Sequence, residues 1–153
     1  MSGRMLSPWL TARVQFVLAA IFVVAGFGKI VDPPGFAHEI HNYKLLPGVA
    51  VNALAVALPW VEVVAGVALF SGIARRSSAR IMGVLLVVFV IALTINLVRK
   101  HPVDCGCFGG PKIPKTDVQR LGDMKFVIAR DLGMLLLVAQ VLAATRREER
   151  DRR

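Results

Sequence analysis

Four long apolar blocks dominate the chain. They cover positions 14–30, 49–72, 81–98 and 126–144, with few polar interruptions. A helix needs about 20 residues to cross a hydrocarbon core of ~30 Å. The first three blocks are long enough, and the fourth is if its charged first turn lies among the lipid headgroups. Because backbone in lipid must satisfy its own hydrogen bonds, the pattern predicts transmembrane helices rather than strands.

Two other interpretations fit the blocks less well. A soluble helical bundle would give each helix a polar face, which these continuous blocks lack. A cleaved signal peptide would explain Arg4 and Arg13, but the first block is long and no small-residue cleavage site follows it. We therefore predict an all-α polytopic membrane protein with a four-transmembrane-helix bundle. The single membrane domain covers 1–153, with its principal part at about 9–144 and a charged cytoplasmic tail at 145–153.

The connection between the first two blocks contains a second, shorter helical pattern. The letters VDPPG end the first helix, because proline and the residue before it disfavour helix. Phe36, Ile40 and Tyr43 then follow at i, i+4 and i+7, which is typical of an amphipathic helix. The opposite side carries the polar residues His38, Glu39, His41 and Asn42. We predict a short helix lying in the membrane interface.

Composition and charge refine this picture. The chain is 56% hydrophobic with a mean hydropathy of +0.62, above the roughly 45–50% apolar content of soluble domains. A net charge of +9 would suggest nucleic-acid binding in a soluble protein. In a membrane protein it predicts contacts with anionic lipid headgroups and no nucleic-acid partner.

Basic residues also predict the orientation. Their numbers on the two sides of a four-span arrangement are nearly equal. The short connection at 75–80, however, holds three arginines and no acidic residue. Short connections dominate the positive-inside rule. We therefore predict cytoplasmic N and C termini, and an outward-facing loop after the third block.

That loop holds both cysteines. It begins after Arg99, runs for about thirty residues up to the fourth block, and contains Cys105 and Cys107 on either side of Gly106. Loops beyond about 12–15 residues are usually functional or disordered. A disulfide between these cysteines would close a very small loop and add little stability. A bond that stabilises little is better suited to a redox couple, and exposed or strained disulfides are the labile ones.

Other roles for the two cysteines stay open. They could be unremarkable small residues that happen to be close. They could also bind a metal together with His101 and one of His38 or His41, although the spacing differs from the usual zinc C-x-x-C. The spacing of the cysteines therefore predicts that no metal is bound. If the pair is redox-active, the chain has no second pair to receive its electrons. The partner must then be another protein's thiols, or a quinone reached directly from the membrane.

Ionisable residues inside the apolar blocks are further candidates. Glu62 lies well within the second block, where a charge is costly and suggests function or pairing. Its candidate partners are Lys29 and Arg130, which could instead extend toward the headgroups. Lys29 could also pair with Asp32, three positions on. Asp131 is expected at the start of the fourth helix, where the helix dipole favours an acid.

Four stretches of the sequence resemble one known family. They are GFGKIVDPPGFAHEIHNYKLLP, LPWVEVVAGVALFSG, DCGCFG and ARDLGMLLLVA, and together they resemble the MauE family of methylamine-utilisation membrane proteins. That family is related to the DoxX-like four-helix proteins. The pattern positions that match are Lys29, Asp32, Glu62, Cys105, Cys107 and Arg130. Asp131 stands where the family often has asparagine.

The resemblance implies a multi-pass protein of the bacterial inner membrane with Cys105 and Cys107 in the periplasm. It implies thiol–disulfide exchange or disulfide formation in a client protein, as in maturation of the methylamine dehydrogenase small subunit. The implied partner is a periplasmic thioredoxin-like protein or a disulfide-containing client. Two alternatives remain. One is a DoxX-like subunit of a quinone-linked oxidoreductase with structural cysteines, and the other is a non-catalytic membrane assembly factor.

Overall fold

The computed structural model describes residues 7–104 and 115–151, which form helices and no strands. The helices are α2 (Pro8–Val31), α3 (Pro33–Asn42), α4 (Gly48–Ser71), α5 (Arg75–Val98) and α6 (Asp117–Asp151). Four of them, α2, α4, α5 and α6, are long and apolar enough to cross a membrane. The predicted all-α membrane bundle with four spans is thereby confirmed.

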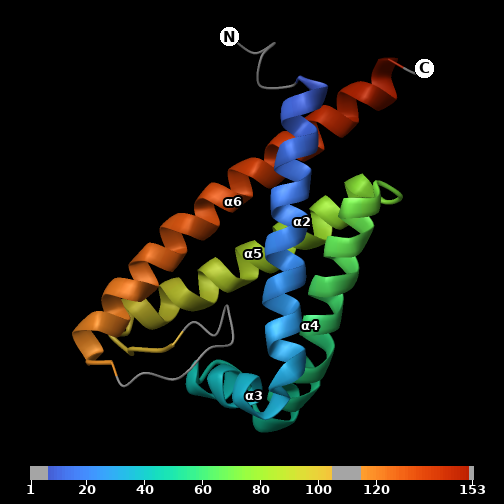
Figure 1. The fold of residues 1–153 in the computed structure, drawn as a ribbon. Helices are drawn as coiled ribbons and strands as arrows, with labels where there is room; N and C mark the ends of the chain where they lie inside the picture. Colours follow the sequence, from blue (N-terminus) through green and yellow to red (C-terminus); the bar gives the residue numbers. More distant parts are fainter. Residues whose placement is uncertain (1–6, 105–114, 152–153) are drawn as a thin grey trace.

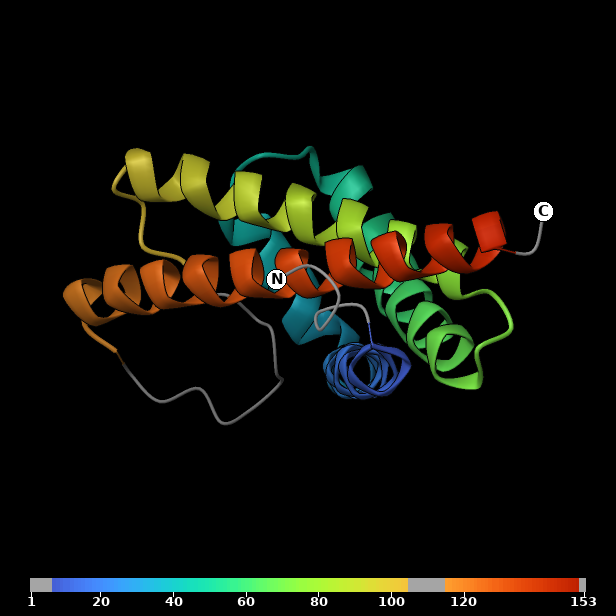
Figure 2. The same ribbon diagram turned by 90° about the horizontal axis from the view of Figure 1, so that it is seen from above.

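The helices form two pairs, α2 with α4 and α5 with α6. Figure 1 shows both termini and the α4–α5 turn at one end of the bundle, with α3 at the other end. In Figure 2, α5 and α6 run side by side while α2 is seen end-on, so the second pair is strongly inclined to α2. The two pairs therefore diverge, and α3 packs against α4 and α2.

Glycines allow α2 and α4 to approach closely. A Cβ atom at Gly26 would lie 2.8 Å from the carbonyl oxygen of Pro59 and 2.8 Å from Cγ2 of Val63. A Cβ atom at Gly66 would lie 2.7 Å from Cγ2 of Val23. Small residues at such contacts are the usual means by which membrane helices pack, since lipid supplies no hydrophobic drive.

The Gly26 contact gives a stability prediction. Gly26→Ala is expected to lower the free energy of unfolding by about 1–3 kcal/mol, because the new methyl group overlaps backbone of α4. Gly133→Ala is the control, since a Cβ atom there meets nothing within 4 Å and alanine favours helix. Thermal unfolding of the purified protein in detergent compares the two. Equal midpoints for both variants would contradict the close packing.

The α5–α6 pair is joined by core packing and by ion pairs at the end that holds the termini. Ala79, Met82 and Leu86 of α5 share one buried cluster with Met134, Val138 and Val141 of α6. A terminal guanidinium nitrogen of Arg75 lies 3.0 Å from a carboxylate oxygen of Glu148, and Arg76 forms an ion pair with Glu149. The charged segment that was expected to form a tail at 145–153 thus continues α6 to Asp151 and pairs with the start of α5.

The prediction that the fourth helix starts near 126 is wrong. Helix α6 begins at Asp117, so the predicted loop of about thirty residues is shorter. Thr116 and Gln119 form a reciprocal cap. The Thr116 N–H donates to Oε1 of Gln119 (3.0 Å), and the Gln119 N–H donates to Oγ1 of Thr116 (3.4 Å). This capping box is a recognisable sequence signal.

Helix α3 follows the predicted amphipathic pattern. The Asp32 side chain caps it by accepting a 3.0 Å hydrogen bond from the Gly35 N–H. Phe36 and Tyr43 are both buried against the bundle. The apolar side of α3 therefore packs against the other helices of the bundle.

Candidate functional site

A buried ion pair joins α2 to α4. The Lys29 Nζ atom lies 2.7 Å from each carboxylate oxygen of Glu62. Their side chains are only 10% and 11% exposed, so Lys29 does not extend to the bundle surface. The Lys29 ammonium also lies 5.1 Å from the centre of the Phe36 ring, a cation–π distance. The structure thus brings Glu62 together with one of its two candidate partners.

A second ion pair lies on α6. Arg130 bonds to its neighbour Asp131, with Nε and one terminal nitrogen each 2.9 Å from the same oxygen. The expectation that Asp131 sits at the start of a helix is wrong. It lies in the middle of α6 and is 1% exposed, because α6 begins earlier than the apolar pattern indicates. A buried carboxylate needs a partner, and Arg130 supplies it.

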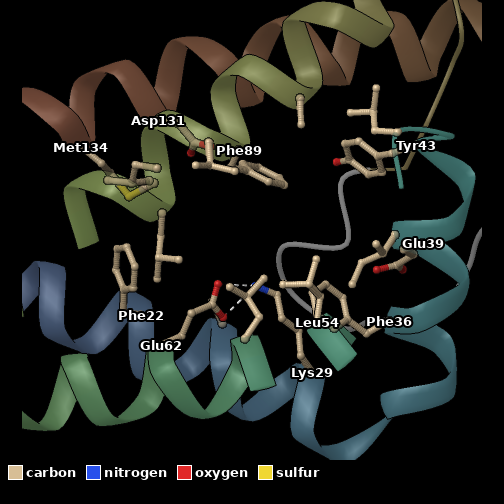
Figure 3. Close-up of a pocket in the computed structure, with 18 of the residues that line it drawn as sticks. Phe22, Lys29, Phe36, Glu39, Tyr43, Leu54, Glu62, Phe89, Asp131 and Met134 are labelled. Atoms are coloured by element: carbon tan, nitrogen blue, oxygen red, sulfur yellow. Dashed lines mark hydrogen bonds and ion pairs between the residues drawn. The ribbon is translucent and has the colours of Figure 1, made fainter. Parts of the chain in front are cut away.

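Both ion pairs line one cavity of about 200 Å³. All five helices contribute to its wall, and most of that wall is apolar. Figure 3 shows Asp131 and Met134 across the cavity from Lys29 and Glu62, with Glu39 and Tyr43 at the side formed by α3. A largely apolar cavity with a few convergent polar groups is the usual form of a small-molecule site.

Two of the four stretches quoted from the sequence, those around Lys29 and Glu62, have local structural explanations. Asp32 caps α3, and this cap fixes the turn that follows Lys29. Pro59 lies three positions before Glu62 and is packed against Gly26. Close packing at Gly26 holds α2 and α4 near enough for Lys29 to meet Glu62. Lys29 thus pairs with Glu62, while the Asp32 carboxylate serves the helix cap.

Cys105 and Cys107 lie outside the described residues, in the segment between Asp104 and Lys115. The residues on both sides of that segment are held in place. Nε2 of His101 lies 3.0 Å from the carbonyl oxygen of Asn42 at the end of α3, and Asp104 lies 3.7 Å from Arg120 of α6. Within 7–104 and 115–151, no three His, Cys, Asp or Glu side chains are arranged to hold a metal ion.

Sequence reasoning missed the aromatic walls of the cavity. Phe22 and Phe89 lie within continuous apolar blocks, where nothing separates a cavity-lining ring from a lipid-facing one. Phe36, Ile40 and Tyr43 were recognised as one face of a helix, and all three line the cavity. The periodic pattern identified this face correctly. Only the packing of α3 shows that the face lines the cavity.

Comparison with known proteins decides the family. Residues 7–144 match the family described as methylamine utilisation protein MauE. The chain belongs to the MauE family. Relatives named methylamine utilization protein MauE include one from Methylophilus methylotrophus, 32% identical over 136 residues, which are 88% of this chain and 70% of the relative.

Two other MauE relatives are shorter matches. The one from Paracoccus denitrificans is 32% identical over 71% of this chain, and the one from Paracoccus versutus is 34% identical over 66%. The matched parts are 59% and 55% of those two relatives, so this chain spans little more than half of their length. No solved structure matches the chain.

Proposed function

We propose that this MauE-family protein assists thiol–disulfide exchange or disulfide formation in a client protein. Cys105 and Cys107 are the reacting pair. The client belongs to the same class as the methylamine dehydrogenase small subunit, and a periplasmic thioredoxin-like protein or the client itself is the partner. The relatives' names supply the link to methylamine utilisation.

The observation on which this proposal depends is the position of the two cysteines in the chain. They are the only cysteines, they stand one residue apart, and their segment joins α5 to α6. The end of α5 and the start of α6 lie at the end of the bundle opposite the termini (Figure 1). A thiol pair in the connection between two membrane-spanning helices suits exchange with a protein in the adjoining aqueous compartment.

The proposal includes location and orientation. The protein resides in the bacterial inner membrane with cytoplasmic termini and periplasmic cysteines. Arg75, Arg76 and Arg80, which were expected in the connection itself, lie in the first two turns of α5 directly after it and support this orientation. Disulfides persist in the periplasm and are rare in the cytosol, so the proposed chemistry requires the same orientation.

Trapping of the partner tests the function. Thiol–disulfide exchange passes through a mixed disulfide, which the second cysteine normally resolves. One of the variants Cys105→Ser and Cys107→Ser is therefore expected to accumulate a covalent adduct with the client or its thioredoxin-like partner. The adduct is detected on non-reducing gels and identified by mass spectrometry. The double variant is the control and should form none.

Absence of an adduct from both single variants, together with full client maturation by the double variant, would contradict the proposal. That result, with loss of maturation in Glu62 and Arg130 variants, would instead favour the quinone-linked subunit with structural cysteines. If every such variant changed only protein abundance, a non-catalytic assembly factor would be the better explanation.

A further inference from the structure

We propose that the cavity binds the ring of a membrane quinone, which accepts the electrons of Cys105 and Cys107. Quinone binding is argued from the described residues alone. The electron-transfer step rests on the proposed thiol–disulfide function.

The cavity has the size and lining that a substituted ring requires. Its volume is about 200 Å³, and an apolar protein cavity of roughly 150 Å³ accommodates benzene. Phe22, Phe36 and Phe89 line it from three different helices. Aromatic rings pack well against another flat ring, either offset or edge to face. These walls favour a planar ligand.

The polar groups match a quinone better than a lipid chain. Lys29 has three N–H donors, and the hydrogen bonds to the two carboxylate oxygens of Glu62 occupy two of them. A quinone oxygen accepts hydrogen bonds, whereas a hydroquinone hydroxyl also donates one. The Lys29–Glu62 and Arg130–Asp131 pairs supply donors and acceptors on opposite sides of the cavity. An acyl chain cannot form hydrogen bonds with ionisable groups, which are costly inside a membrane.

The cavity also reaches the lipid-facing surface. Leu54 of α4 and Val88 of α5 line it, and they are 37% and 61% exposed. Both residues lie within candidate membrane spans. The apolar tail of a membrane quinone can therefore remain in the hydrocarbon while its ring enters between the two helix pairs.

One wall of the cavity is connected to the cysteine segment. Val103, two positions before Cys105, is buried in the same cluster as Tyr43, which lines the cavity. The Tyr43 ring lies 6.4 Å from the Phe89 ring. His101 is joined to the end of α3 through the carbonyl of Asn42. The chain leading into Cys105 is thus packed against residues that enclose the cavity.

The reaction balances without another cofactor. As the bond between the two sulfur atoms forms, the two thiols give up two electrons and two protons. The quinone takes up both electrons and both protons and becomes the hydroquinone. Because the sequence has only this cysteine pair, the electrons leave it for another molecule, and in this proposal that molecule is the quinone.

A cavity-filling variant tests the binding. Full-length protein carrying Cys105→Ser and Cys107→Ser is reconstituted in lipid nanodiscs, and binding of ubiquinone-1 is measured by equilibrium dialysis. Adding Ala25→Phe, which fills the cavity, is expected to weaken saturable binding by at least about tenfold. Ala20→Phe is the matched control, because Ala20 lies on the same helix but is exposed. Ala92→Phe fills the cavity from α5 and replaces Ala25→Phe if that variant does not fold.

Electron transfer is measured separately with the native cysteines. Reduced protein is mixed with ubiquinone-1, and one hydroquinone is expected for each disulfide formed. The filling variants should slow this reaction as much as they weaken binding. If ubiquinone-1 binds the filled and native cavities equally, or if a tightly held phospholipid occupies the cavity and ubiquinone-1 does not displace it, the quinone site is refuted.

These outcomes separate the two proposals. A trapped client without saturable ubiquinone-1 binding would refute the quinone site and leave the thiol–disulfide function standing. Saturable binding that is abolished by Ala25→Phe, with no mixed disulfide and no thiol oxidation, would support the site and refute the redox role of the cysteines.

Discussion

Replacing Lys29 with methionine is expected to destabilise the protein strongly. Glu62 would remain as a buried carboxylate without its cation, which costs about 3–5 kcal/mol. Unfolding of the purified protein in detergent measures the change. Lys125→Met is the control, because Lys125 lies exposed on α6 and its replacement should have almost no effect.

Removing both charges should reverse the loss. The double variant Lys29→Met, Glu62→Leu replaces the ion pair with apolar side chains of similar volume, which is often neutral or stabilising. It is expected to unfold near the wild-type temperature and yet to bind ubiquinone-1 poorly. A single variant as stable as wild type, or a double variant no better than the single one, would contradict the buried pair.

This pair also shows what the sequence alone reveals. A carboxylate within an apolar block is conspicuous, because a charge in lipid is costly, and Glu62 was recognised for that reason. The four spans follow from the same energetics, since each block is long enough to cross the membrane. The prolines of VDPPG were recognised as the end of the first helix, but they also form the first turn of α3, where proline is well tolerated.

Other features depend on how the helices pack. Choosing between Lys29 and Arg130 as the partner of Glu62 requires knowing that Gly26 brings α2 against Pro59 of α4. Helix α6 extends beyond its apolar block because a helix satisfies its own backbone and can continue into water. The capping box at Thr116 is the sequence signal for that extension, which hydropathy alone does not indicate. The cavity itself arises from the divergence of two helix pairs, which no local pattern specifies.

Labelling of the cysteines in intact cells is expected to give an all-or-none result. A membrane-impermeant maleimide should label Cys105 and Cys107 almost completely after reduction, and hardly at all before it. The reason is that the proposed location is oxidising and outward, so the sulfurs are accessible but bonded. The fraction labelled is read from the mass shift of the purified protein. Labelling without prior reduction would show free thiols and would contradict a resident disulfide.

Two matched variants establish the sidedness independently of the native cysteines. In the background Cys105→Ser, Cys107→Ser, single cysteines replace Val118 and Ile73, which are 80% and 88% exposed. Val118 lies near the start of α6, and Ile73 lies in the α4–α5 turn at the opposite end. Val118→Cys should react in intact cells, whereas Ile73→Cys should react only after the cells are permeabilised. The reverse pattern would place the cysteine segment in the reducing cytosol, where a stable disulfide does not form, and the proposed exchange with a periplasmic client would be wrong.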